Sequence, residues 1–222
     1  MGPEEVTLPA WQAFFFDFDG VLADSVEVKT RAFALLFEPY GPEVMAKVVD
    51  HHRRHGGMTR FDKFRHYFRE FLGKPLDEAG LADLCRRFSQ LVVDEVVASP
   101  AIPGSVAFLE RWHQKVPCFV VSATPEDEIH AIVRRRGLTT FFKGVAGAPP
   151  SKKEIIQRFL TQYKLTGAKC LFFGDAESDY RAAQAWGVNF LAILPNESAP
   201  LLRVAPEISW VRDFNQIKLS EK

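Results

Sequence analysis

Short apolar runs, three of them followed at once by a polar residue or glycine, constrain the fold of this chain most. They cover residues 13–16 before Asp17, 118–121 before Ser122 and 170–173 before Gly174, with a fourth run at 188–193. Uninterrupted apolar runs of this length are typical of strands in a parallel sheet that is covered on both faces. We therefore expect a buried parallel sheet.

Helical patterns with recognisable ends separate these runs. Thr124 and Pro125 are expected to be the N-cap and first residue of one helix, which Gly137 closes. Ser151 and Glu154 have the spacing of a capping box at the start of another helix. The alternation of strand and helix predicts an α/β fold with a doubly wound parallel sheet.

One long segment, residues 25–100, interrupts the alternation and is expected to be purely helical. Its apolar stripes at helical spacing are typical of a packed core; they include Phe61, Phe64, Phe68 and Phe71, then Leu81, Leu84, Phe88 and Val92. We predict a helical cap domain at 25–100, a discontinuous α/β core at 12–24 and 101–222, and an N-terminal extension at 1–11.

Composition excludes several classes of protein. The 28 basic residues equal the 28 acidic ones, whereas nucleic-acid-binding domains usually have a basic excess. No apolar run approaches the roughly 18 residues that a membrane span needs. The three cysteines, Cys85, Cys118 and Cys170, have neither a disulfide nor a metal-knuckle spacing. We expect a cytoplasmic protein that binds neither nucleic acid nor membrane.

Acidic residues gather at one predicted edge of the sheet. Asp17, Ser122 and Asp175 follow strands, and Asp19 and Asp179 come soon after. Ligands of open parallel sheets bind beyond the carboxyl ends of the strands, where these residues meet. Since clustered carboxylates repel one another, a cation is expected there, and oxygen ligands favour Mg²⁺.

Two lysines point to an anion near the same edge. Lys152 and Lys153 fall in the first turn of the helix after Ser151. The helix dipole disfavours positive charge there by roughly 0.3–1 kcal/mol. A lysine directed toward a bound anion would offset this cost, although a solvated surface pair is the simpler alternative.

The motifs in this order resemble those of the haloacid dehalogenase superfamily. Residues 16–21, Phe-Asp-Phe-Asp-Gly-Val, are similar to its first motif, and Gly174–Asp179 to its fourth, Gly-Asp-x-x-x-Asp. Ser122 and a lysine within 151–153 resemble the second and third. The resemblance covers about residues 12–195. The helical insert is similar to the C1 cap of the subgroup that contains phosphoglycolate phosphatases and β-phosphoglucomutases.

The resemblance implies a role for each acid. Asp17 would be the nucleophile that forms an aspartyl-phosphate, and its ordinary pKa of about 4 would keep it ionised. Asp19 would protonate the leaving group and then deprotonate water; dehalogenating relatives lack this carboxylate. Asp17, the main-chain carbonyl of Asp19 and Asp175 would hold Mg²⁺, with Asp179 orienting the lysine and the metal-bound waters.

The resemblance also implies a phosphate site. Ser122, the backbone N–H of Ala123 and Lys152 would bind the phosphate. Lys152 has the register of the third motif relative to Glu154, but Lys153 stays an alternative.

A basic stretch in the cap has two interpretations. Residues 47–74 contain eight Lys and Arg against three acids. They form either a solvated helical face or a site for a second anionic group of the substrate, at the Gly56-Gly57 turn and Arg60. His51 and His55 are one helical turn apart but lack the glutamate of a zinc-protease helix.

Three functions fit these residues. The first is Mg²⁺-dependent hydrolysis of a small phosphomonoester, with a small phosphorylated metabolite as partner. The second is a sugar phosphomutase that uses the same residues. The third is a non-catalytic binding or regulatory module, which the presence of both Asp17 and Asp19 disfavours.

Overall fold

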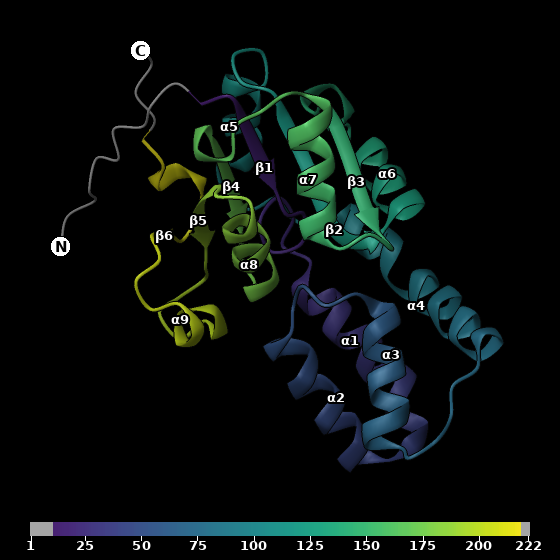
Figure 1. Cartoon of the computed structure of the whole chain (residues 1–222). Helices are drawn as coiled ribbons and strands as arrows, with labels where there is room; N and C mark the ends of the chain where they lie inside the picture. Colours follow the sequence, from purple (N-terminus) through teal and green to yellow (C-terminus); the bar gives the residue numbers. More distant parts are fainter. Residues whose placement is uncertain (1–10, 219–222) are drawn as a thin grey trace.

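A parallel sheet organises residues 11–218, the part of the chain that the computed structural model describes (Figure 1). The expected extension at 1–11, apart from Trp11, and residues 219–222 lie outside this part. The strands are β1 (Ala13–Phe16), β2 (Cys118–Pro125), β3 (Gly144–Ala148), β4 (Cys170–Gly174), β5 (Asn189–Ile193) and β6 (Trp210–Val211). Their order across the sheet is β3-β2-β1-β4-β5-β6, with every pair parallel. The predicted α/β fold is confirmed.

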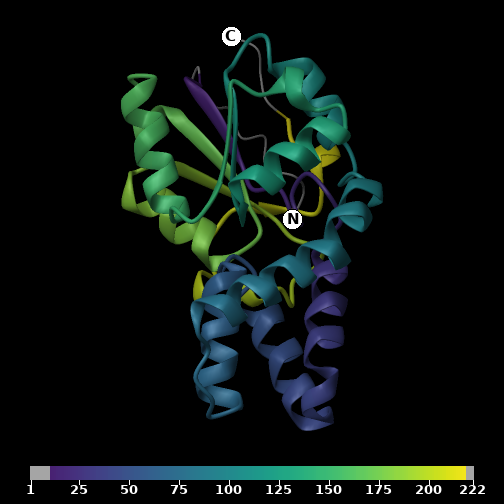
Figure 2. The same cartoon turned by 90° about the vertical axis from the view of Figure 1, so that its right-hand side faces the viewer.

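Helices cover both faces of the sheet and form a separate group at one end of it. The covering helices are α5 (Ser105–Trp112), α6 (Glu126–Arg135), α7 (Lys152–Gln162) and α8 (Glu177–Ala185), and the short α9 (Pro200–Val204) lies near β5 and β6. The separate group is α1 (Val26–Phe37), α2 (Pro42–Arg54), α3 (Arg60–His66) with a π-helical turn at Tyr67–Phe71, and α4 (Glu78–Ala98). We call α1–α4 the cap. It is inserted between β1 and β2 (Figures 1 and 2), while its limits at 25 and 100 stay a prediction.

Strand β1 is the centre of the sheet, between β2 and β4, and its four residues are fully buried. Side chains alternate between the faces of a strand. Phe14 and Phe16 pack with Phe108 of α5, and Phe15 packs on the opposite face with Phe159 of α7. The aromatic run thus anchors both layers of helices and fixes the position of the residue that follows it, Asp17.

Strand β2 is longer than predicted, and this changes the role of Thr124. The expected strand ended before Ser122, but β2 continues to Pro125, which is itself the N-cap position of α6. Thr124 is therefore not the helix cap. Its hydroxyl lies instead among polar side chains at the carboxyl edge of the sheet. The interpretation of Thr124-Pro125 as a helix start was wrong by one residue, because the extended conformation before proline continued the strand.

Strands β3 and β6 were not predicted. β3 reads Gly-Val-Ala-Gly-Ala, so it lacks the β-branched and aromatic residues that mark a strand. Its small residues have a packing reason, because a Cβ on Gly144 would lie 2.9 Å from the ring of Phe159. β6 has only two residues, at the other edge of the sheet.

The predicted helix ends at Ser151 and Gly137 are confirmed. Ser151 and Glu154 form the capping box of α7. Gly137 follows α6 with a φ of 70°, a conformation that glycine adopts without strain. Thr59 caps α3 by accepting a hydrogen bond from the backbone N–H of Asp62. Among residues 11–218, no helix has the length and apolar character to cross a membrane.

Replacing Phe15 with alanine tests the central packing. Phe15 is fully buried and stacks on the rings of Phe119, Phe159 and Phe172. The Phe15→Ala variant should lose about 3–5 kcal/mol in the free energy of unfolding, measured by urea denaturation. Leu35→Ala, at a cap residue that is 56% exposed, should change it by less than about 0.5 kcal/mol. A similar loss for both variants would contradict the assignment of Phe15 to the core.

Candidate active site

The turns after β1 and β4 meet closely at the carboxyl edge of the sheet. The backbone N–H of Asp17 donates to the carbonyl of Phe173 over 2.9 Å, which fixes the two strand ends side by side. Gly20 has a φ of 79° and lies against the carboxylate of Asp175, so close that a Cβ would overlap it. Glycine at position 20 therefore lets the first turn approach the second.

Three carboxylates lie together at this edge. Oxygen atoms of Asp17, Asp175 and Asp179 are all within 4.8 Å of one another. Lys152 lies between two of them, with Nζ 2.7 Å from Asp17 and 2.5 Å from Asp179. The other oxygen of Asp179 accepts hydrogen bonds from the backbone N–H groups of Asp175 and Ala176. Asp179 thus fixes both the lysine and the turn after β4.

Burial and crowding shift the pKa values of this cluster. Burial raises the pKa of Asp17 to about 7 although Lys152 opposes the change, and Asp179 and Asp19 raise it further. Burial and the neighbouring Asp17 also raise the pKa of Asp175 well above its usual range. Burial alone would lower the pKa of Lys152, but Asp17 and Asp179 outweigh it, so the lysine stays charged. Without a bound cation, the ordinary pKa on which the sequence analysis relied therefore does not apply to Asp17.

The donor set fits a hard divalent cation. Asp17 and Asp175 offer carboxylate oxygens, which are the ligands that Mg²⁺ prefers. A dication beside these carboxylates would favour their ionised forms and reverse the raised pKa values.

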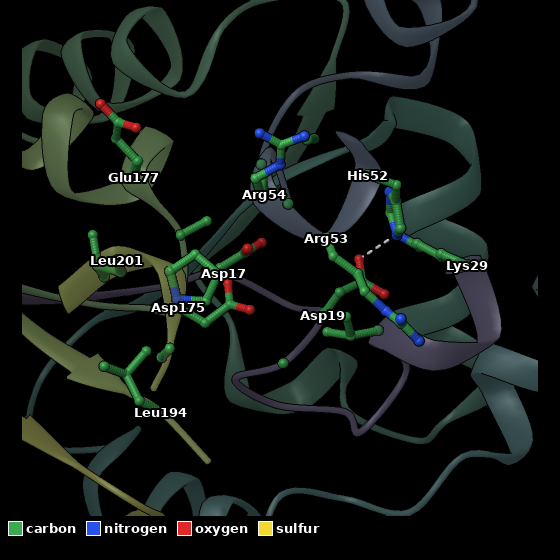
Figure 3. Close-up of a pocket in the computed structure, with 18 of the residues that line it drawn as sticks. Asp17, Asp19, Lys29, His52, Arg53, Arg54, Asp175, Glu177, Leu194 and Leu201 are labelled. Atoms are coloured by element: carbon green, nitrogen blue, oxygen red, sulfur yellow. Dashed lines mark hydrogen bonds and ion pairs between the residues drawn. The ribbon is translucent and has the colours of Figure 1, made fainter. Parts of the chain in front are cut away.

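Asp19 lies apart from this cluster and is turned toward the cap (Figure 3). Its carboxylate is paired with Lys29 of α1, accepts a 2.6 Å hydrogen bond from the Ser25 hydroxyl, and lies 3.3 Å from the Thr124 hydroxyl. Burial would raise the pKa of Asp19, but Lys29 more than compensates and lowers it. Two aspartates that are two residues apart are therefore in opposite electrostatic environments.

Lys29 and Thr124 are polar site residues that the sequence analysis missed. Lys29 Nζ lies 2.8 Å from the Thr124 hydroxyl, so α1 of the cap and β2 of the core meet at Asp19. One signal was available for Lys29. It is four residues after Ser25, which places both side chains on one face of a helix that starts directly after the first motif.

The remaining predicted phosphate ligands lie close to this edge. Ser122 is buried at the end of the apolar part of β2, and its Oγ accepts a 3.1 Å hydrogen bond from the backbone N–H of Thr124. Ala123 lines the cavity over the carboxylates. Of the two lysines, Lys152 is buried at the carboxylates, whereas Lys153 is exposed. The geometry favours the register that placed Lys152 in the third motif.

A cavity of about 660 Å³ lies between the cap and the core. Asp17, Asp19 and Asp175 line it from the core side, and basic residues of α1–α3 line it from the cap side. Figure 3 shows the acids near Arg53, Arg54 and other basic side chains from the cap.

Arg60, which the sequence analysis proposed for substrate recognition, lines this cavity but already has acidic and polar partners. Its guanidinium pairs with both carboxylate oxygens of Glu128 on α6, one of them over 3.0 Å, and donates to the Ser89 hydroxyl over 2.8 Å. Arg60 therefore joins the cap to the core. It could contact a substrate only if this pair separated, so its proposed role stays a prediction that the geometry disfavours.

A comparison of sequences places the chain in a known family. The family model described as haloacid dehalogenase-like hydrolase matches residues 11–187. Phosphoglycolate phosphatase from Synechococcus elongatus is 26% identical over 193 residues, which cover 82% of this chain and 83% of that protein.

Two solved structures share the fold. The HAD-hydrolase YfnB from Bacillus subtilis, bound to magnesium, has a TM-score of 0.69 and 19% identity, covering 94% of this chain and 97% of that one. CbbY from Rhodobacter sphaeroides in complex with xylulose-1,5-bisphosphate has a TM-score of 0.74 and 18% identity, with the same coverage. The chain belongs to the haloacid dehalogenase-like hydrolases.

Proposed function

We propose that this protein is a Mg²⁺-dependent phosphatase that hydrolyses a small phosphomonoester through an aspartyl-phosphate on Asp17. The observation that carries the proposal is the contrast between two nearby acids. Asp17 lies in the carboxylate cluster beside Lys152, whereas Asp19 faces the cavity and the cap. A nucleophile and a proton-transfer group need such different surroundings.

Repulsion is the main obstacle to attack by Asp17. A carboxylate about 4 Å from a phosphate dianion meets roughly 8 kcal/mol of repulsion at an effective dielectric constant near 20. Lys152, 2.7 Å from Asp17, offsets part of it. Mg²⁺ would be held by Asp17, the main-chain carbonyl of Asp19 and Asp175. Its charge would offset the remaining repulsion and would favour the ionised form of Asp17.

The other phosphate ligands would be Ser122 and the backbone N–H of Ala123, which belong to the end of β2. They would orient the phosphoryl oxygens so that an oxygen of Asp17 attacks phosphorus in line with the leaving oxygen. Asp179 would keep Lys152 in position through its 2.5 Å ion pair.

Asp19 would transfer the protons. In the first half-reaction its proton would pass to the leaving alkoxide as the ester bond breaks. In the second, its carboxylate would take a proton from water, and the resulting hydroxide would displace phosphate from Asp17. Lys29 and Ser25 favour the ionised form of Asp19 in the free protein. A bound phosphate dianion opposes this effect, because negative charge raises the pKa of a nearby carboxyl.

The size of the cavity and the relatives support a small phosphorylated metabolite as the substrate. A cavity of about 660 Å³ suits a small metabolite, and the Synechococcus elongatus relative is named for its action on phosphoglycolate. A sugar phosphomutase would use the same residues. Product analysis separates the two activities, because hydrolysis releases inorganic phosphate and the mutase returns an isomeric sugar phosphate.

Asparagine at position 17 tests the nucleophile. Asp17→Asn keeps the shape of the side chain but removes the charge, so the release of phosphate from p-nitrophenyl phosphate with Mg²⁺ should fall by about 10⁴-fold. Asp127→Asn, at an exposed residue of α6, should retain full activity. Substantial turnover by a folded Asp17→Asn protein would show that another residue attacks phosphorus.

Asparagine at position 19 tests proton transfer. Asp19→Asn should lower the turnover of ethyl phosphate by about 10²–10⁴-fold, because the departing ethoxide needs a proton. The loss in the first half-reaction should be smaller for p-nitrophenyl phosphate, since nitrophenolate leaves without one. Pre-steady-state release of nitrophenolate measures this step separately. Equal losses for both esters in that step would contradict the acid role of Asp19.

Chelation tests the metal. Dialysis against EDTA should abolish phosphate release, and excess Mg²⁺ should restore it, because the cation is needed to offset the charge of three clustered carboxylates, two of them buried. Circular dichroism before and after dialysis serves as the folding control. Full activity after complete removal of metal would exclude the proposed Mg²⁺ site.

A further inference from the structure

The basic side chains on the cap side of the cavity differ in whether they have an acidic partner. Four of them are paired: Lys29 with Asp19, Arg53 with Glu27, Arg54 with Asp50, and Arg60 with Glu128. Lys63 also lines the cavity and, within residues 11–218, forms no ion pair with a carboxylate. It is 1% exposed, so solvent does not replace the missing partner.

The contacts of Lys63 are with neutral groups. Its Nζ lies 2.7 Å from Nδ1 of His52, 3.5 Å from the carbonyl of Gly56, and 5.5 Å from the centre of the Phe33 ring. A buried ammonium group needs an anion or several hydrogen-bond acceptors to offset the loss of water. These contacts supply only part of that requirement.

His52 adds an unused hydrogen-bond donor at the same place. Because Lys63 can only donate, Nδ1 of His52 accepts, and the ring proton of neutral His52 is therefore on Nε2. Nε2 is buried and has no hydrogen-bond partner. The carbonyl of Val26 is near enough to raise the pKa of His52 slightly, yet it makes no hydrogen bond to Nε2. An acceptor is missing at this point of the cavity wall.

The electrostatics agree with this geometry. Burial, with Lys29 nearby, lowers the pKa of Lys63 to about 7, and burial together with Lys63 lowers that of His52 to about 2. Burial is the largest cause of both shifts, and the negative charge of Asp19 opposes it only in part. An anionic ligand group would raise the pKa of Lys63 and accept from both side chains.

We propose that Lys63 and His52 bind a second anionic group, a carboxylate or a phosphate, on the leaving-group side of the substrate. The inference rests on the proposed phosphatase function and narrows its substrate class to phosphomonoesters with this second charge. The inference assigns recognition of the second anionic group to Lys63 and His52. Arg60 is not assigned this role, because it already pairs with Glu128 and donates a hydrogen bond to Ser89.

One small molecule could reach both ends of this site. Asp17 and Asp19 line the same cavity as Lys63 and His52, the acids from the core and the two donors from α3 and α2 of the cap. With the phosphoryl group at Asp17, the leaving group would extend past Asp19 toward the cap. A second anion there would bind cap and core at once and hold the cap over the reacting atoms.

Paired ligands test the inference. 2-Phosphoglycolate and ethyl phosphate have similar chain lengths, but only the first has a carboxylate. Their inhibition constants against p-nitrophenyl phosphate measure binding whether or not either is turned over well. We expect 2-phosphoglycolate, or a sugar bisphosphate against its monophosphate, to bind about tenfold to hundredfold more tightly to the wild-type protein.

Lys63→Met removes the charge and keeps the length of the side chain, so it should reduce the preference for 2-phosphoglycolate at least tenfold. His52→Phe should also reduce this preference. Lys47→Met, at an exposed lysine of α2, is the matched control and should keep the wild-type preference. Thermal unfolding of each variant shows whether it is folded.

The outcomes separate the inference from the function on which it rests. If p-nitrophenyl phosphate is not hydrolysed, the phosphatase proposal fails, and calorimetric titration of the same ligands still measures the preference. If the wild-type protein binds the ligands with and without the second anionic group equally tightly in both pairs, this result alone overturns the inference. An unchanged preference in folded Lys63→Met would also overturn it.

Discussion

The structure of the site depends on the ion pairs of Lys152 with two buried carboxylates. Asp17 is in the turn after β1, and Asp179 is in the first turn of α8, which follows the adjacent strand β4. Without a cation between them, the repulsion of the two carboxylates would oppose closure of this edge. The strand order β2-β1-β4 brings the turns together, and the capping box of Ser151 starts α7 where its first residue reaches both acids. The fold therefore places Lys152 where its charge offsets the charges of the two carboxylates.

This arrangement gives two aspartates of one short motif different chemistry. Asp17 belongs to the buried edge of the sheet, where its pKa is raised and a divalent cation would fit. Asp19 lies beyond the end of β1 and pairs with Lys29 of the cap, which lowers the pKa of Asp19. Because Lys29 belongs to α1, the pKa of Asp19 depends on the position of the cap.

Much of the core could be predicted from the sequence because its signals are local. Uniformly apolar strands, helix caps and polar residues at strand ends located Asp17, Asp175 and the pair Lys152 and Lys153, of which the family resemblance favoured Lys152. The contacts of Thr124 with Lys29 and of Arg60 with Glu128 join residues 95 and 68 positions apart, so no local pattern contains them. β3 was missed because it lacks β-branched and aromatic residues apart from one valine, and its glycines leave room for close neighbours, Phe159 of α7 at Gly144 and the backbone of Thr124 and Glu126 at Gly147.

The Arg60–Glu128 pair has a consequence for how the two halves of the molecule separate. Both side chains are almost fully enclosed, at 4% and 10% exposure, and they belong to opposite sides of the interface. Separating the two side chains removes their Coulomb attraction, but each charged group then regains its hydration. For buried ion pairs, the free energy lost and the free energy gained nearly cancel. The contact therefore determines the relative orientation of the cap and the core more than the strength of their association.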